Sequence, residues 1–409
     1  MLLCAFLWAA AQASLYDQVV TRHDPNNGYE DYLRAADLIR NTDIHAYLAR
    51  ASDGQTAKSA DALDYLAAMR TATEKYGSAL AAIRQGNLKH SWEPRPVLDA
   101  KTRYPEDVPF EELGKLVQAD AYVKFADGDS KDAVQDLLDG MTFARHIAAS
   151  AVIGEIVSLT AESAVLSTFD HHLGQVSERD AAEIVRYVDA ALAETDPLAK
   201  VIETGRDVHI RMVADLLASK ESIGALRGGD DKELGSYLAG LSQAELRTVL
   251  EGYTNVTNDC YGRMAARLGA DESQWADPFD FWPDLVPPST VTTPQDASLR
   301  MLYLTQPTGL AHLFRYAVIV RTRLRLLRLQ AKIIEFRWHH NRLPATLAEA
   351  APPALCFDPV TKAPFLYEMK EGASYRLYSK GSPASGEIEL GMELKSLGSV
   401  ANDGAVPPP

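Results

Sequence analysis

The sequence predicts a mainly α protein, in which an irregular array of antiparallel α-hairpins is followed by one long C-terminal helix and a small antiparallel β unit (α+β). Three observations predict this fold class. Apolar residues recur every three or four positions through most of 29–268, the same spacing runs uninterrupted over 313–338, and short alternating segments with glycine-bearing turns follow Asn341. The first two patterns are typical of helices, and the third is typical of strands.

The helical array is expected to span 14–270 and to consist of helix pairs with short connections. Helices predicted over 110–125 and 131–149 are separated by the polar turn 127–130, and so short a loop makes antiparallel neighbours. The segment from Ala119 to Ala133 resembles one tetratricopeptide helix-turn-helix, with a generic helical bundle as the alternative. One predicted helix face is formed by five apolar residues, Leu66, Met69, Tyr76, Leu80 and Ile83.

Capping residues mark several helix starts. Ser177 and Ser242 each precede an acid by three positions, Asp180 and Glu245, which is the pattern of a capping box. Pro197 suits the first turn of a helix, where its missing N–H has no partner to lose. We therefore expect helices to begin directly after Ser177, at Pro197 and directly after Ser242.

The segment 271–296 interrupts the helical pattern with several prolines, which forbid a continuous helix. Its large aromatic residues are Trp275, Phe279, Phe281 and Trp282. Aromatic side chains on a backbone restricted by prolines are typical anchors of interfaces. We therefore predict that these four residues bind a partner; the alternative is that they cover the core of the protein itself.

One long helix is predicted over 297–342, packed on the array through a narrow apolar seam. The seam consists of Leu313, Ala317, Val320, Leu324, Leu327, Ala331, Ile334 and Trp338. A basic stripe lies beside it, formed by Arg321, Arg325, Arg328 and Lys332. Because the whole chain is acidic, we expect this stripe to pair with acidic neighbouring helices. A surface for nucleic acid or anionic lipid is the alternative.

A small α+β unit is predicted over 343–395, with strands near 365–367, 375–378 and 388–390, and 396–409 is expected to be a disordered tail. The residues that suggest a family for this unit are Asn341, Leu343, Pro344, Asp358, Pro359, Pro364, Tyr367, Tyr375, Leu377, Tyr378, Ser379 and Gly381. On these positions the unit resembles the globular head of type II secretion pseudopilins. That resemblance implies a long helix, a proline turn and a small antiparallel sheet.

Two departures from the pseudopilins limit what the resemblance implies. A long helical region precedes the unit, and the stretch 382–386, where several pseudopilins bind calcium, has no carboxylate. With its apolar leader, its alanine-rich body and the Asn-Gly-Tyr-x-x-Tyr entry from Asn27 to Tyr32, the chain resembles envelope proteins of planctomycete-type bacteria. This second resemblance implies an architecture and no activity.

The first 13 residues, MLLCAFLWAAAQA, are uncharged and mostly apolar, and Ala11-Gln12-Ala13 before Ser14 matches a signal-peptidase site. The stretch is too short to span the roughly 30 Å hydrocarbon core of a membrane. We expect a signal peptide, or the end of a membrane anchor that starts upstream. Either places the protein in the cell envelope, as a periplasmic or secreted protein or anchored to the inner membrane.

Composition and motifs point away from several functional classes. The chain has 409 residues, with 41 Lys and Arg against 56 Asp and Glu and a net charge of −15, which disfavours nucleic acid as a partner. No HExxH, nucleophile elbow, P-loop or dinucleotide fingerprint occurs. Cys260 and Cys356 either pair or pack separately, and their distance in sequence excludes a CxxC site. We predict no cofactor and no metal.

A second candidate site is a polar cluster on one predicted helix, formed by Arg206, Asp207, His209 and Arg211. These residues either line a groove or form ion pairs between hairpins. Two functions therefore remain. The sequence favours a non-enzymatic envelope scaffold that binds a protein or peptide partner, since no nucleophile, metal or cofactor motif is present. The alternative is a helical hydrolase that uses carboxylates on a glycan-type substrate.

Overall fold

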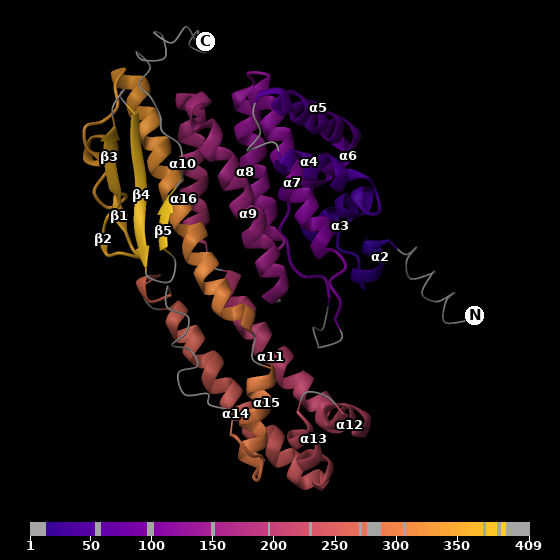
Figure 1. Cartoon of the computed structure of the whole chain (residues 1–409). Helices are drawn as coiled ribbons and strands as arrows, with labels where there is room; N and C mark the ends of the chain where they lie inside the picture. The colour runs from indigo at the N-terminus through magenta and orange to yellow at the C-terminus, as the bar shows by residue number, and fades with distance from the viewer. Residues whose placement is uncertain are drawn as a thin grey trace.

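The computed structural model confirms the mainly α fold class, with a small antiparallel sheet near the C-terminal end (Figure 1). The residues that the structure describes are 14–53, 59–95, 102–148, 152–194, 197–228, 231–269, 272–275, 288–305, 308–370, 374–382 and 386–389. The expected leader, 1–13, and the expected tail, 396–409, lie outside them. None of the described helices is long and apolar enough to cross a membrane.

The N-terminal helices share one apolar core. They are α2 (Leu15–Val19), α3 (Gly28–Ile39), α4 (Ile44–Asp53), α5 (Ser59–Lys75), α6 (Gly77–Asn87) and α7 (Asp107–Ala126). Helices α3 and α6 approach so closely that a Cβ on Gly86 would collide with the Tyr32 ring, and a Cβ on Gly28 would collide with the Gly86 carbonyl. Glycine at both positions therefore permits the close approach that fixes the start of α3.

The middle helices continue the array as antiparallel neighbours. They are α7, α8 (Ser130–His146), α9 (Val152–His172), the short 3-10 helix η2 (Leu173–Gln175) and α10 (Glu178–Ala193). The predicted pair over 110–125 and 131–149 corresponds to α7 and α8. Gly128 has a φ of 82°, and the Asp129 carboxylate accepts from the Asp132 backbone N–H at 3.2 Å. The turn therefore ends one helix and caps the next.

A lower lobe with its own core follows (Figure 1). It is formed around α11 (Pro197–Ala218), α12 (Lys220–Gly228), α13 (Lys232–Ala239), α14 (Gln243–Leu268) and α15 (Pro294–Thr305), with the 3-10 helix η3 (Glu272–Gln274) between the last two. The predicted helix starts are confirmed. Ser177 and Ser242 cap α10 and α14 through their hydroxyls, Ser242 within a full capping box, and α11 begins at Pro197.

The single helix predicted over 297–342 is wrong, because the structure has two helices there. α15 ends at Thr305 and packs on α14 in the lower lobe, whereas α16 (Thr308–His340) packs on α9 and α10. Pro307 lies between them and cannot continue the hydrogen-bonding pattern of α15. The predicted seam positions are buried, with Trp338 partly so.

The apolar surface of α16 is wider than the predicted narrow seam, since Leu326, Leu329 and Ile333 are buried as well. Helices α9 and α10 contact α16, and strands β4 and β5 contact it too. The β unit therefore covers a second face of the same helix. Its side chains Tyr375 and Leu377 belong to the same apolar core as α16.

In the part of the C-terminal unit that the structure describes, the strands form two small sheets. Its elements are α17 (Leu347–Ala350), β1 (Phe357–Asp358), β2 (Ala363–Pro364), β3 (Leu366–Lys370), β4 (Ser374–Ser382) and β5 (Gly386–Glu389). Strands β1 and β2 form one antiparallel pair, and β3, β4 and β5 form a second antiparallel sheet in that order. Tyr367 lies opposite Leu377 in this register.

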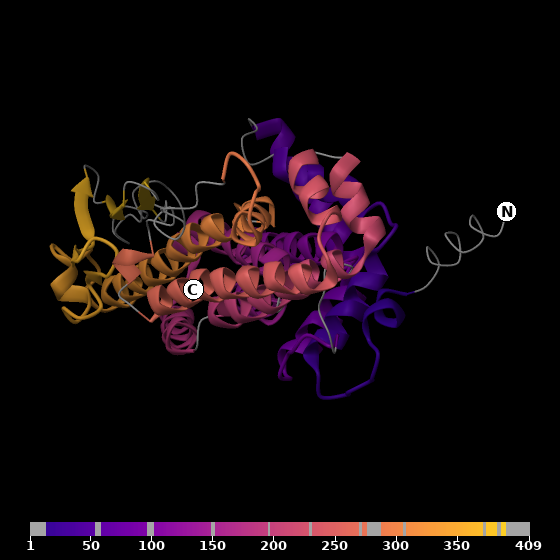
Figure 2. The same ribbon diagram turned by 90° about the horizontal axis from the view of Figure 1, so that it is seen from below.

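The described helices and strands form an elongated molecule (Figure 1). In Figures 1 and 2 the yellow strands lie on the opposite side of the molecule from most of the indigo N-terminal helices. Cys260 belongs to the lower-lobe core and Cys356 to the α16 core, and both are buried free thiols. Burial raises the pKa of Cys260 to about 11, so the thiol stays protonated near neutral pH.

Candidate functional site

The main candidate site is a groove of about 680 Å³ where the start of α10 meets the end of α16. Its lining residues are Ser177, Glu178, Arg179, Ala182, Lys332, Glu335, Phe336, Trp338, His339, His340 and Ala350. The three helices α10, α16 and α17 therefore supply its walls. We call this hollow the α10–α16 groove.

Aromatic rings form much of the lining of the α10–α16 groove. The rings of Phe336 and His340 are stacked with centroids 4.0 Å apart, and the His340 Nδ1 lies 2.9 Å from the Phe336 carbonyl oxygen. Trp338 is partly buried, and its indole N–H donates to the Val176 carbonyl at 3.4 Å. These contacts hold the rings in place before any partner arrives, which lowers the entropy lost on binding.

The rim of the α10–α16 groove carries both signs of charge. His339 lies 3.5 Å from Glu178, and Lys332 lies 2.7 Å from Glu335. Most of these side chains are partly or fully exposed, so each pair is worth little to stability and can exchange its partner for another at small cost. An apolar floor with a polar rim is the anatomy of a protein interface.

The predicted anchor Trp275 is a core residue in this structure. Its side chain is only 4% exposed, its ring meets Phe314 edge to face with centroids 6.4 Å apart, and the Arg321 guanidinium lies 5.7 Å from the ring centre. In this conformation Trp275 offers no surface to a partner. The other three predicted anchors, Phe279, Phe281 and Trp282, lie outside the described residues.

The structure only partly gathers the predicted polar cluster on α11. Arg206 and Asp207 form an ion pair at 2.9 Å, Arg211 is exposed, and His209 Nδ1 lies 2.5 Å from the Tyr261 hydroxyl. Burial lowers the pKa of His209 to about 4, so its ring is neutral at pH 7. Arg206 is the member of this cluster that lines a second groove, of about 520 Å³, between α11 and α14.

The three arginines of the basic stripe pair with acids of neighbouring elements, as predicted, whereas Lys332 pairs with Glu335 of α16 itself. Glu272 accepts from Arg321 at 2.9 Å and from two nitrogens of Arg325 at 2.7 Å, and Arg328 lies 2.7 Å from Asp189. Burial alone would raise the pKa of Glu272, but the two arginines lower it below its ordinary value. Two cations thus share one acid at η3, which fixes this short helix against α16.

A carboxylate cluster at the start of α7 was not predicted from the sequence. Arg95 donates to Glu93 at 3.0 Å and 3.1 Å and to Glu106 at 2.7 Å and 2.8 Å. Tyr29 of α3 donates its hydroxyl hydrogen to Glu106 at 3.1 Å. Glu106 and Tyr29 are buried. We call Glu93, Arg95, Glu106 and the adjoining Asp107 the Arg95 cluster.

The Arg95 cluster holds more acids than cations. Burial and the Glu106 charge raise the pKa of Asp107 to about 7, although Arg95 opposes the shift. Burial also raises the pKa of Glu93. A carboxylic acid that titrates near neutral pH is suited to general acid–base chemistry. Neither groove described above is lined by a residue of this cluster.

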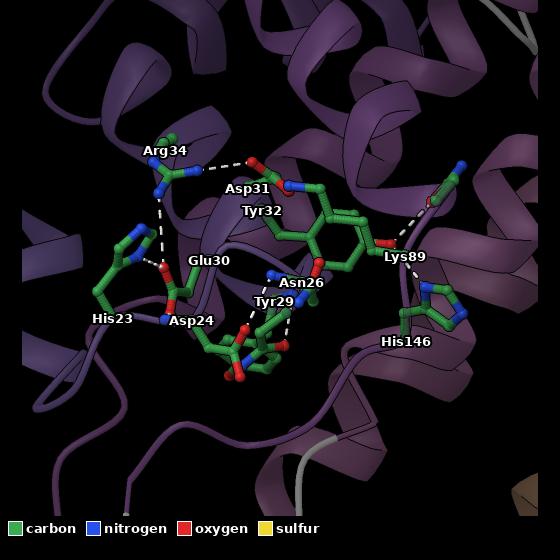
Figure 3. Close-up of polar contacts among 12 residues, drawn as sticks. His23, Asp24, Asn26, Tyr29, Glu30, Asp31, Tyr32, Arg34, Lys89 and His146 are labelled. Atoms are coloured by element: carbon green, nitrogen blue, oxygen red, sulfur yellow. Dashed lines mark hydrogen bonds and ion pairs between the residues drawn. The ribbon is translucent and has the colours of Figure 1, made fainter.

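A second polar network surrounds the start of α3 (Figure 3). The buried Glu30 accepts hydrogen bonds from the Tyr16 hydroxyl at 2.7 Å and the Asp24 backbone N–H at 2.7 Å, and its carboxylate lies 2.6 Å from His23. Burial alone would raise the pKa of Glu30, but these hydrogen bonds lower it. The Arg34 guanidinium lies 3.5 Å from the Glu30 carboxylate, on the exposed side of the helix.

The Asn-Gly-Tyr-x-x-Tyr entry, which contains Glu30, makes further contacts beside this network. Asn27 caps α3 by accepting from the Tyr29 backbone N–H at 3.1 Å, and its side-chain amide donates to the Trp92 carbonyl at 3.0 Å. The Tyr32 hydroxyl donates to Asn87 at 2.9 Å and lies 2.7 Å from His146 Nδ1 (Figure 3). The motif was visible in the sequence, but its partners come from distant segments.

No cluster of three or more His, Cys, Asp or Glu side chains within the described ranges is arranged to hold a metal ion. A scan against protein-family models, a search of curated proteins and a search of solved structures each gave no match.

Proposed function

We propose that the chain is an exported or membrane-anchored helical scaffold of the cell envelope, and that a peptide segment of a partner protein occupies the α10–α16 groove. The observation that carries the proposal is the preformed ring surface of Phe336, Trp338 and His340 inside a rim of both charges. Aromatic residues are the most frequent energetic anchors of protein interfaces. The apolar leader expected over 1–13 supports the envelope location.

The chemistry of the α10–α16 groove favours a peptide over a small charged ligand. A phosphate or nucleotide would need a surplus of cations, whereas Arg179 and Lys332 are balanced here by Glu178 and Glu335. An extended peptide brings apolar side chains for the rings and backbone groups for the polar rim. We expect its apolar side chain to contact Trp338.

The C-terminal unit has a supporting role in this proposal. It covers α16 through β4 and β5, and α17 contributes Ala350 to the α10–α16 groove. The unit thereby holds the end of α16 in the orientation that presents Trp338. Its resemblance to the pseudopilin head stays part of the proposal, as a way for a small sheet to stabilise the end of a long helix.

Site-specific photocrosslinking in the native envelope tests this proposal. A photoreactive amino acid at Ala182 or His339 lies in the α10–α16 groove, and the same residue at Met369, which is exposed on β3, serves as the matched control. We expect one defined crosslinked partner from both groove positions and none from Met369. Trp338→Ala should remove the crosslink at Ala182 without lowering the amount of folded protein.

The outcome that contradicts the proposal is equally defined. If the same partner crosslinks from Met369, or if Trp338→Ala leaves the Ala182 crosslink unchanged, the α10–α16 groove is not the binding site. A partner that instead crosslinks from the segment 276–287 would place the binding site in the proline-rich region, as the sequence predicted.

The Arg95 cluster supports a second candidate, a carboxylate-based hydrolase acting on a glycan-type substrate. The specific observation is Asp107, whose pKa is raised to about 7 beside a buried Glu106. Glycoside hydrolysis uses two carboxyl groups, one of which gives up a proton near neutral pH. The test is an assay of peptidoglycan-fragment hydrolysis. Activity in the wild type that is lost in both Asp107→Asn and Glu106→Gln, while both variants stay folded, would favour this candidate. Hydrolysis that survives both changes would exclude it.

A further inference from the structure

We propose that the exposed side of α3 and the adjoining segment 88–92 rest on a lipid surface, with Leu38, Leu88 and Trp92 inserted among the headgroups. We call these three residues, together with Arg34 and Lys89, the α3 surface. The inference rests on the membrane-anchored form of the envelope location proposed above. It does not depend on what occupies the α10–α16 groove.

Large apolar side chains stand out from the body on the α3 surface. Leu38 is 48% exposed, Leu88 is 81% exposed and Trp92 is 39% exposed. Along 88–92, outward-facing side chains alternate with inward-facing ones. Lys89 turns inward to Asp31 at 2.5 Å and Ser91 donates to the His146 carbonyl at 2.8 Å, while Leu88 and Trp92 face outward. The apolar side chains are therefore displayed by a segment that is itself firmly held.

One acid joins the two ends of the α3 surface. Asp31 binds Arg34 of its own helix at 2.6 Å and Lys89 of the adjoining segment at 2.5 Å (Figure 3). Leu38 follows Asp31 by seven residues, which is about 10 Å along a helix. Because Arg34 lies between Asp31 and Leu38 on the exposed side of α3, cationic side chains separate the apolar ends of the surface.

The path of the chain places the apolar leader beside the α3 surface. The backbone N–H groups of Leu15 and Tyr16 donate to the Asp37 carboxylate at 2.6 Å and 3.1 Å. Asp37 directly precedes Leu38, so the described chain begins next to the exposed leucine. The 13 uncharged residues that precede Ser14 are outside the described residues, and they join the body at this point.

This attachment point argues for lipid as the occupant. An apolar segment that enters a membrane beside Leu38 brings the α3 surface to the headgroup region at no further cost in translational freedom. Leucine and tryptophan with neighbouring Lys and Arg are the composition of interfacial surfaces. Asp31 and the neighbouring Glu30 together balance the charges of Arg34 and Lys89, and the chain is acidic overall, with a charge of −15. Binding should therefore come from apolar insertion and depend little on anionic lipid.

The test uses the full chain with Cys4→Ser, since Cys260 and Cys356 are buried and react poorly. Leu38→Cys or Leu88→Cys receives a polarity-sensitive dye. The matched controls are Leu304→Cys, at a position 44% exposed, and Met369→Cys, at a position 46% exposed. Vesicles of phosphatidylcholine, alone or with phosphatidylglycerol, are then added. We expect aqueous iodide to quench the dyes at 38 and 88 several-fold less on vesicles, with no change at 304 and 369.

A second variant separates the surface from the leader. Leu38→Asp with Leu88→Asp should lower vesicle partitioning of the full chain by about tenfold, whereas Trp338→Ala should leave it unchanged. Dyes at 38 and 88 that remain as accessible as the controls on bound vesicles would overturn the proposal and leave the leader as the anchor. A full chain that does not bind either vesicle would overturn it too, without affecting the peptide site in the α10–α16 groove.

Discussion

The α16 region and the Arg95 cluster both bury charged side chains, but cations outnumber acids in the first and acids outnumber cations in the second. At α16 two arginines share Glu272, and at the start of α7 one arginine is shared by Glu93 and Glu106, with Asp107 beside them. The surplus of cations lowers the pKa of Glu272, whereas burial and the surplus of acids raise the pKa of Asp107. The charge ratio, and not burial alone, decides the direction of each shift.

The two regions also differ in what they offer to other molecules. The end of α16 presents the partly exposed Trp338 and the exposed His340 in the α10–α16 groove, beside ion pairs that are partly or fully exposed. The Arg95 cluster has a shifted pKa but buries Glu106 and Tyr29. A perturbed carboxyl group alone is thus a weak sign of function, because structural ion-pair networks shift pKa values as well.

The largest effect is expected from Arg95→Met. This change leaves Glu93 and Glu106 buried without their shared cation, and it should lower the free energy of unfolding at pH 7 by about 3–5 kcal/mol. Chemical denaturation measures the loss. Arg263→Met is the matched control, since Arg263 pairs with Asp259 on an exposed helix face, and it should cost less than about 0.5 kcal/mol. Equal losses for the two variants would show that the Arg95 cluster is hydrated.

Glu272→Gln should be next in size, at about 3 kcal/mol, because Arg321 and Arg325 both lose their carboxylate. Glu335→Gln in the same region removes the partly exposed partner of Lys332, a carboxylate that pairs with no second cation within the described residues, and should cost about 0.5 kcal/mol or less. Thermal denaturation of both proteins at pH 7 makes the comparison. A loss as small for Glu272→Gln as for Glu335→Gln would mean that η3 is not fixed by its ion pairs.

The smallest stability effect, and the one of opposite sign, is expected from Asp107→Asn. The folded pKa of Asp107 is about 7, above the 3.8 of the free side chain. The folded protein therefore binds more protons between these values, and its stability falls as pH rises from about 4 to about 7. Asp107→Asn removes this decline, and it should raise stability at pH 8 by about 1 kcal/mol after solvent screening is allowed for.

Denaturation midpoints between pH 5 and 8 measure the difference between wild type and Asp107→Asn. Glu272 does not interfere in this window. Its folded pKa is lowered, so its stabilising contribution is present above the 4.5 of the free side chain and is lost only as pH falls further. A difference between the two proteins that stays constant from pH 5 to 8 would contradict the shift at Asp107.

Local signals in the sequence were sufficient for much of the fold. Ser177, Pro197 and Ser242 marked helix starts because a cap depends on residues a few positions away. The break between α15 and α16 was missed although Pro307 was visible, since the apolar spacing on either side suggested one helix. The wide burial of α16 was missed because it depends on where the β unit packs, which no local pattern states.

The candidate sites were harder to predict, because their residues come from distant parts of the chain. The Tyr29–Glu106 contact joins residues 77 positions apart, and the α10–α16 groove joins Glu178 to Trp338. Trp338 was predicted as a seam residue, and the structure places its indole N–H on the Val176 carbonyl, just before α10. Trp275, by contrast, was predicted to be a partner anchor, and Phe314 and Arg321 cover it in the core.

The most direct test of the central claim is isothermal titration calorimetry. It measures the affinity of the purified full chain for the partner's peptide that crosslinks in the α10–α16 groove. We predict that Trp338→Ala weakens binding at least tenfold, as is typical of an aromatic anchor, while Asp107→Asn binds as tightly as wild type. The contrary result is a peptide whose affinity is unchanged by Trp338→Ala and lowered by Asp107→Asn. That result would move the binding site from the α10–α16 groove to the Arg95 cluster.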